Sequence, residues 1–170
     1  MNILEPLMLD SFGALEAASC FACALPLLLV PVLMSFPDLW EGSTCYSKPD
    51  EYGEPKAWRS AMRTPLNACS SLGYYYAGVY TLHNMMARTL RRSPQNCSDA
   101  EPQWHIAFGI ALLWVGLASF LFHASLTERW RLLDAGATMG VTAISTMSTV
   151  YRSIRAALAP APRRLAEEAS

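Results

Sequence analysis

Apolar residues are gathered into long segments without a charged residue, and they do not alternate with polar ones. Three such segments cover residues 17–37, 64–87 and 102–127. Each reaches the roughly 20 residues that an α-helix needs to cross the hydrocarbon core of a bilayer. A fourth segment, residues 132–151, follows a short charged stretch and holds Asp134 near its start. The pattern predicts an all-α, polytopic helical membrane protein with about four transmembrane helices.

Polar stretches divide the chain into four parts. We expect an N-terminal segment with an extra transmembrane helix (1–37), a polar loop (38–63), the N-terminal part of a membrane domain (64–151) and a polar tail (152–170). The first apolar segment could instead be a signal peptide, but no Lys or Arg precedes it, which favours a retained helix. The 13 Lys and Arg residues are shared almost equally between the two expected membrane sides, so the orientation stays open.

Composition supports the membrane class and excludes another. Hydrophobic residues make up 52% of the chain and charged residues 16%, and the net charge is -1. Without a basic stripe, the chain is not expected to bind nucleic acid. The cysteines Cys45 and Cys97 fall in loops expected on opposite sides of the membrane, so they cannot pair within one chain. Cys20 and Cys23 have the spacing of half a zinc site, but a second pair is missing and apolar filling is favoured.

The third span carries the residues that are hardest to explain by packing alone. Ser119 and His123 lie one helical turn apart on the same face. Asp134 would lie about 16 Å beyond His123 if that helix continued. The charged residues 128–131 indicate instead that the chain leaves the bilayer there and turns back, which brings Asp134 beside His123. Singly, each side chain has a structural explanation, but polar groups that meet inside a membrane usually mark a functional site.

These residues carry a resemblance to a known family. Gly116, Ser119, Phe122 and His123, followed by Asp134 at the opening of the next helix, resemble the signature of the alkaline ceramidases. Their superfamily of seven-helix membrane hydrolases also includes the adiponectin-type receptors and the enzymes that remodel GPI-anchor lipids. The preceding span adds a second match.

In that span, Asn67, Ser70 and Ser71 look like the family's Asn-x-x-Ser-Asn motif, with Ser71 in place of the final Asn. The likeness covers residues 67–139. It implies a partial seven-helix ceramidase-like bundle.

The resemblance implies a zinc-dependent lipid amide hydrolase that converts ceramide to a sphingoid base and a fatty acid. It implies that His123 is a zinc ligand, that Ser119 and Asp134 are catalytic beside the metal-bound water, and that Asn67 and Ser71 bind substrate or pack helices. A zinc ion with an open coordination position lowers the pKa of the water bound there. In such a site Asp134 could accept the proton of that water, and the Ser119 hydroxyl could donate a hydrogen bond to the oxyanion. The implied partners are a ceramide-like lipid and the bilayer, with self-association as a further expectation. The implied location is a multi-pass protein of the endoplasmic reticulum or Golgi.

The sequence departs from the family in two ways. The family completes its zinc site with His-x-x-x-His on its last helix, which this sequence lacks, and His83 and His105 are expected at the opposite membrane surface. With four expected helices where the family has seven, we expect a C-terminally truncated chain with an incomplete zinc site.

The family's acidic calcium-binding stretch is not matched either, because the acids of residues 38–51 are spaced differently and Thr64 stands where a Glu is expected. We therefore expect no calcium site. The alternative function is a non-catalytic receptor-like or scaffold membrane protein of the same superfamily.

Overall fold

The computed structural model describes residues 4–36, 39–40, 61–91 and 101–158, and the regular secondary structure of this part is helical. The four helices are α1 (Leu4–Met34), α2 (Pro65–Arg91), α3 (Glu101–Ser125) and α4 (Glu128–Leu158). The predicted all-α class is confirmed for these residues. The positions on which two further expectations depend lie outside the described part. They are Cys45 and Cys97 for the loop topology, and Asp38, Glu41, Asp50 and Glu51 for the absence of a calcium site.

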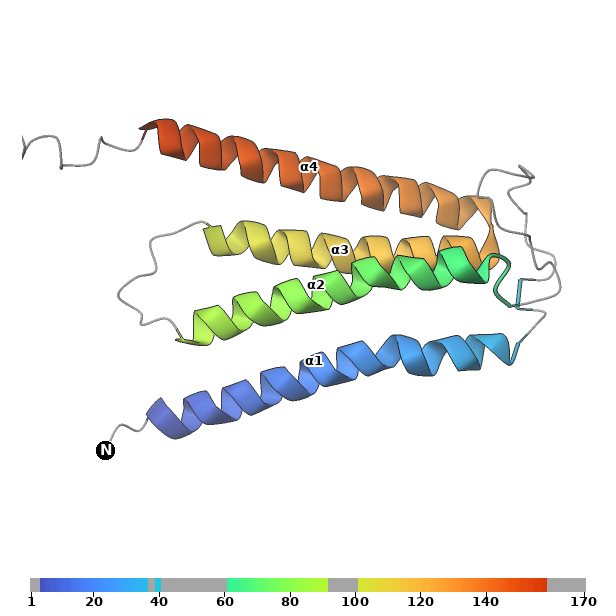
Figure 1. Cartoon of the computed structure of the whole chain (residues 1–170), viewed down its shortest axis with the longest axis horizontal. Helices are drawn as coiled ribbons and strands as arrows, with labels where there is room; N and C mark the ends of the chain where they lie inside the picture. Colours follow the sequence, from blue (N-terminus) through green and yellow to red (C-terminus); the bar gives the residue numbers. More distant parts are fainter. Residues whose placement is uncertain (1–3, 37–38, 41–60, 92–100, 159–170) are drawn as a thin grey trace, which may run out of the picture.

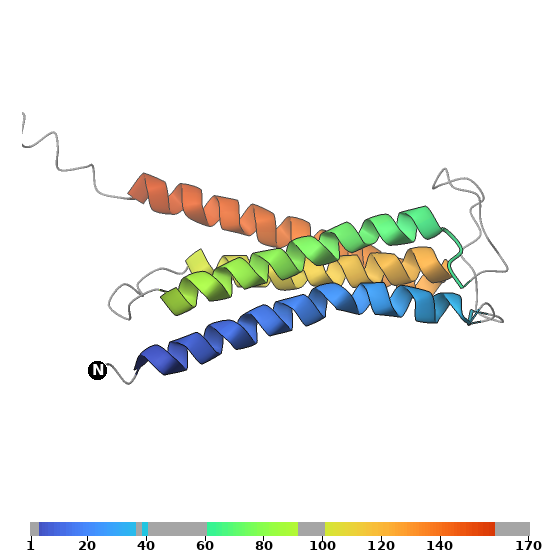
Figure 2. The same cartoon turned by 60° about the horizontal axis from the view of Figure 1, so that its bottom comes forward.

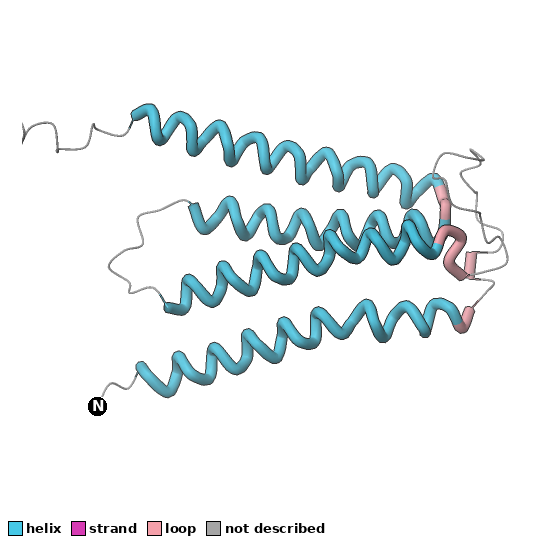
Figure 3. Tube along the Cα trace, in the orientation of Figure 1, coloured by secondary structure: helices cyan, strands magenta, loops and turns pink. Residues whose placement is uncertain are grey.

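Successive helices run antiparallel and lie side by side in chain order (Figures 1 and 2). The closest pair is α2 with α3, and α4 and α1 pack on α3 and α2 respectively. The described residues outside helices gather at one end of the array, which we call the turn end (Figure 3). The turn end holds the C-termini of α1 and α3 and the N-termini of α2 and α4, so polar groups from all four helices can meet there.

The turn between α3 and α4 is shorter than predicted. Helix α4 begins at Glu128, so the expectation that residues 128–131 form a loop is wrong. The chain reverses instead at Leu126, whose φ of 50° is left-handed, and Thr127, whose carbonyl accepts the Arg131 amide at 3.0 Å. Glu128 and Arg131 form an ion pair, which holds the pKa of the Glu128 carboxyl below its usual value. These charged residues therefore form the first turn of α4, where the negative charge of Glu128 interacts favourably with the positive end of the helix dipole.

The end of α4 also differs from the prediction. The helix continues to Leu158, so residues 152–158, which were expected to belong to the polar tail, are helical. Arg152 and Arg155 are exposed within this extension. A basic last turn is favourable because it faces the negative end of the helix dipole.

Two helices have the length and composition to cross a membrane. Gly13–Met34 in α1 and Gln103–Ser125 in α3 have mean hydropathies of 2.2 and 2.0. The segment in α1 lies near the N-terminus, where a signal sequence has the same character. Within the described residues, α2 and α4 do not meet this criterion, because Tyr, Asn, Ser and Thr interrupt their apolar residues. The structure therefore shows two candidate spans where four were predicted.

Glycines bring α2 and α3 into contact at the level of the backbone. A Cβ atom at Gly78 would lie 2.7 Å from the amide nitrogen of Leu113 and 2.8 Å from the carbonyl oxygen of Gly109. A Cβ atom at Gly116 would lie 2.7 Å from the Cα of Tyr75. Seams of small residues of this kind let membrane helices approach closely, because packing and not water exclusion holds such helices together.

We expect Gly78→Ala to lower the free energy of unfolding by about 1–3 kcal/mol, because the added methyl group meets backbone atoms that cannot move independently. Gly140→Ala is the matched control, since nothing lies within 4 Å of the Cβ position at Gly140. That control should leave stability unchanged or raise it by up to about 1 kcal/mol. Thermal unfolding in detergent, followed by circular dichroism, measures both variants. Equal losses of stability would contradict the close approach of α2 and α3.

Candidate functional site

The C-terminus of α3 is closed by the two residues that precede α2. The backbone amide of Arg63 donates to the Ala124 carbonyl at 2.9 Å, and the guanidinium donates to the Ser125 carbonyl at 2.7 Å. The amide and the hydroxyl of Thr64 donate to the His123 carbonyl at 3.1 and 2.6 Å. The last carbonyl groups of a helix have no partner within the helix. These bonds supply that partner and fix the backbone at His123.

Arg63 is buried, with only 6% of its surface exposed. Its positive charge lies at the C-terminus of α3, where the helix dipole is negative. The guanidinium also donates to the Trp40 carbonyl at 3.1 Å, and the Trp40 indole donates to the Ala61 carbonyl at 2.8 Å. Sequence reasoning missed this role of Arg63. The adjacent pair Thr64 and Pro65, which is typical of the N-cap and first position of a helix, indicates only that α2 begins there.

Ser119 and His123 lie on the last two turns of α3, as their spacing indicates. Ser119 is buried, and His123 is partly buried. The hydroxyl of Ser71, itself buried on α2, donates to the Ser119 hydroxyl at 3.0 Å. Residue Ser71 therefore joins α2 to α3 at the level of the candidate site.

Asp134 returns to the same place from α4. Its side chain is partly buried, forms a hydrogen bond with the side chain of Ser119, and interacts electrostatically with His123. The structure thus brings Ser119, His123 and Asp134 together at the turn end. Their catalytic and metal-binding roles stay predictions.

The hydroxyl groups form an ordered chain. Each serine hydroxyl has one proton. Because Ser119 donates to the Asp134 carboxylate, the proton between the two serines must come from Ser71, although the Asn67 carbonyl also lies 2.8 Å from the Ser71 hydroxyl. In a Ser-His-Asp triad the imidazole stands between hydroxyl and carboxylate. Here the hydroxyl contacts the carboxylate directly, which suits a residue that positions Asp134 better than a nucleophile.

The other two histidines take part in different contacts. His83 on α2 lies 2.8 Å from the Ser19 hydroxyl on α1. His105 lies near the start of α3, 3.2 Å from the Arg152 guanidinium on α4. Since α3 is one continuous helix, the rise of 1.5 Å per residue separates His105 from His123 by about 27 Å. Neither contact belongs to the turn-end site.

The donor set at this site falls short of a catalytic zinc centre. Among the described residues, no three His, Cys, Asp or Glu side chains are grouped so that they could hold a metal ion. His123 and Asp134 offer two ligands, whereas catalytic zinc usually takes three from the protein. Cys20 and Cys23 are free cysteines on the exposed surface of α1. The described residues by themselves therefore do not fit a catalytic zinc site.

No known protein family, curated protein or solved structure matches the chain. The likeness to alkaline ceramidases consequently rests on the sequence motifs alone.

We expect Arg63→Met to lower the free energy of unfolding by at least about 2 kcal/mol. The change keeps an apolar stem but removes the charged donors to the Ser125 and Trp40 carbonyls, and hydrogen bonds from charged groups contribute about 1.5–3 kcal/mol each. Arg129→Met is the control, because Arg129 is exposed near the same turn. Chemical denaturation in detergent measures both. Similar stabilities for the two variants would show that the bonds of Arg63 do not hold α3.

Ser71→Ala should cost about 0.6–1.7 kcal/mol, which is the range measured for hydrogen bonds between membrane helices. Ser70→Ala is the matched control on the adjacent residue, because the Ser70 hydroxyl is exposed and bonds only within its own helix. The same denaturation measurement applies. If the Ser70 variant lost as much stability as the Ser71 variant, the interhelical bond to Ser119 would have no energetic role.

Proposed function

We propose that this chain is a membrane-embedded lipid amide hydrolase of the alkaline ceramidase type, which converts ceramide to a sphingoid base and a fatty acid. The observation that carries the proposal is the meeting of Ser119, His123 and Asp134 at the turn end. These side chains come from two helices joined by a tight turn, and Ser71 from a third helix supports them. Their types and their order along the chain agree with the family signature.

The surface of the helices supports the placement in a membrane. Large apolar side chains are exposed on different helices, including Leu27 at 69%, Tyr80 at 70% and Met139 at 72%. Soluble monomers rarely expose large contiguous apolar patches. We propose that all four helices span the bilayer, and that the protein belongs to the endoplasmic reticulum or Golgi. In this setting the ceramide-like substrate reaches the site from the lipid.

Asp134 is the candidate for proton transfer. Amide hydrolysis adds water across a carbon–nitrogen bond. In the proposed reaction Asp134 accepts a proton from water as the water oxygen attacks the carbonyl carbon, and the nitrogen receives that proton as the bond breaks. Ser119 orients the carboxylate through its hydrogen bond. The single Ser119 proton cannot also stabilise an oxyanion unless this bond opens.

Zinc enters the proposal through the resemblance, with His123 as its ligand. A zinc centre would need further ligands from outside the described residues, contributed by other parts of the protein or by a second copy.

This shortage favours a second candidate, a non-catalytic receptor-like or scaffold membrane protein of the same superfamily. Such a protein would keep the packing of Ser71 against Ser119 without turnover. The two candidates differ in a measurable activity.

The test is hydrolysis of an N-acyl sphingoid base by the protein expressed from its complete reading frame, in membranes that lack other ceramidases. We expect His123→Ala to remove most of the turnover, because the loss of a metal ligand removes metal and rate together. Ser119→Ala should cost less, about 100-fold to 1,000-fold if the bond to Asp134 opens in the reaction and Ser119 donates to the oxyanion. His83→Gln is the matched control histidine, since it can keep the bond to Ser19 on α1, and it should retain turnover. Zinc content, measured by elemental analysis after dialysis against a mild chelator, should fall with activity in the His123 variant.

Wild-type turnover in the His123→Ala variant would refute the assigned site. A folded wild-type protein that lacks both turnover and zinc would favour the scaffold. Stoichiometric zinc bound by the 170-residue chain alone would show that its ligands include residues outside the described part, or that two copies share the metal.

A further inference from the structure

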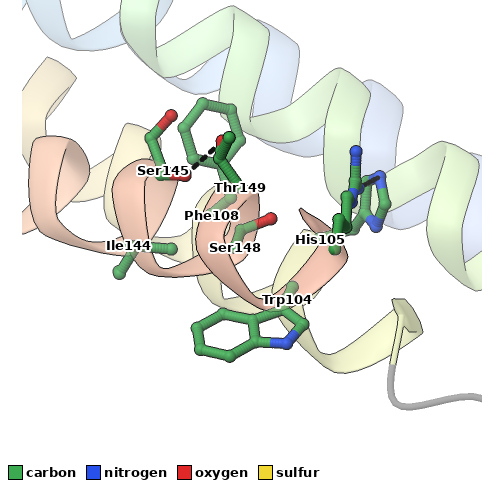
Figure 4. Close-up of a pocket in the computed structure, with 8 residues that line it drawn as sticks. Trp104, His105, Phe108, Ile144, Ser145, Ser148 and Thr149 are labelled. Atoms are coloured by element: carbon green, nitrogen blue, oxygen red, sulfur yellow. Dashed lines mark hydrogen bonds between the residues drawn. The ribbon is translucent and has the colours of Figure 1, made fainter. Parts of the chain in front are cut away.

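A second polar site lies between α3 and α4, toward the end of the helix array opposite the turn end (Figure 4). It is a hollow of about 230 Å³, several times the volume of a water molecule. Its polar lining comes from His105 on α3 and from Ser145, Ser148, Thr149 and Arg152 on α4. Among the described residues that line it, none is acidic. The hollow therefore offers a positive charge and hydroxyl groups without a competing carboxylate.

The Arg152 guanidinium is held at this hollow by His105. The Nη2 atom of Arg152 lies 3.2 Å from Nε2 of His105. Arginine can only donate, so Nε2 accepts this bond and the imidazole is neutral, with its proton on Nδ1. The guanidinium is a planar fork of donors whose geometry suits two oxygen atoms of one anion. The bond to His105 orients the guanidinium beside the hollow.

The surroundings are typical of a membrane–water interface. The rings of Trp104 and Tyr151 pack across α3 and α4 with their centroids 6.0 Å apart. Trp and Tyr are enriched at headgroup level, where Arg side chains also place their charge. Phe108 and Ile144 continue the lining with apolar surface (Figure 4). One hollow therefore combines anion-binding groups with an apolar wall.

We propose that this hollow binds a phosphate group, and that in the membrane its source is a phospholipid headgroup. Arg152 binds the phosphate oxygens, the Ser148 hydroxyl adds a hydrogen bond, and Phe108 and Ile144 contact the start of the lipid chains. The site is separate from the Ser119 site and does not depend on the proposed amide hydrolysis. A phosphate monoester suits it best, because the extra charge strengthens each bond to the guanidinium.

The experiment is isothermal titration calorimetry of the purified chain in neutral detergent with dioctanoyl phosphatidic acid. Dioctanoylglycerol, which lacks the phosphate, and inorganic phosphate, which lacks the chains, are titrated in parallel. We expect Arg152→Gln to weaken the affinity for the phosphatidic acid by at least about tenfold. Arg155→Gln is the matched control, because Arg155 is exposed on the same last turns of α4, does not line the hollow and removes the same charge. The affinity of the Arg155→Gln variant for the phosphatidic acid should stay within about twofold of the wild-type value.

His105→Phe tests the geometry without a change of charge, since it keeps a ring but removes the acceptor that holds Arg152. It should weaken binding several-fold, and circular dichroism checks that each variant keeps its helices. Competition by inorganic phosphate with the same dependence on Arg152 would support the site and identify free phosphate as a sufficient ligand.

Three results would overturn the proposal. The first is an equal loss in Arg155→Gln and Arg152→Gln, which would mean general electrostatic attraction. The second is equally tight binding of dioctanoylglycerol, and the third is unchanged affinity in both Arg152→Gln and His105→Phe. The hydrolysis assay is independent of each of these measurements, so a failure here leaves the proposed activity unaffected.

Discussion

The satisfied C-terminus of α3 is the constraint on which the turn end depends. An unsatisfied buried carbonyl costs about 1–3 kcal/mol, and more in lipid, where water cannot replace the missing donor. Five consecutive carbonyls of this helix end have a named donor. Leu121 accepts from the Ser125 hydroxyl, Phe122 from the Leu126 amide, His123 from Thr64, Ala124 from the Arg63 amide, and Ser125 from the Arg63 guanidinium. Apart from Ser125, which belongs to α3 itself, the donors lie in the turn before α4 and in the two residues before α2, so one helix end fixes three elements.

The position of the candidate site follows from this constraint. Thr64 holds the backbone of His123, and the left-handed Leu126 directly afterwards reverses the chain. The reversal is what returns Asp134 to Ser119 from the next helix. On the other side, the close approach at Gly116 lets α2 come near enough for Ser71 to reach the same hydroxyl. These polar groups meet because helix packing and helix capping fix the positions of the helices that carry them. The hydrogen bonds between the polar groups add to that arrangement.

Much of the fold could be predicted from the sequence, because uncharged segments of helix length are a strong signal. Three of the four helices follow from that signal, and the fourth helix and the return of Asp134 follow from the charged stretch at residues 128–131. The position of the turn could not be predicted in this way, because charge alone suggested a loop at residues 128–131. The spacing of Glu128 and Arg131 also fits an ion pair within a helix, and the structure has that pair. Arg63 was missed for a different reason. A single arginine in a polar loop gives no sign of burial, and only the path of α3 past the loop determines it.

The Ser119 proton decides which chemistry the turn end can perform. An ionised carboxylate can only accept, so the hydrogen bond between Ser119 and Asp134 uses the Ser119 proton, and the Ser71 hydroxyl donates the next bond to Ser119. A substrate carbonyl that approaches Ser119 competes with a carboxylate, which is the stronger acceptor, in surroundings where a broken bond is not replaced by water. Ser119 can therefore serve a substrate only when Asp134 gains another partner, such as a proton or a cation. A hydrolase in which Ser119 contacts the substrate needs that second partner at Asp134, whereas one in which Ser119 only orients the Asp134 carboxylate does not.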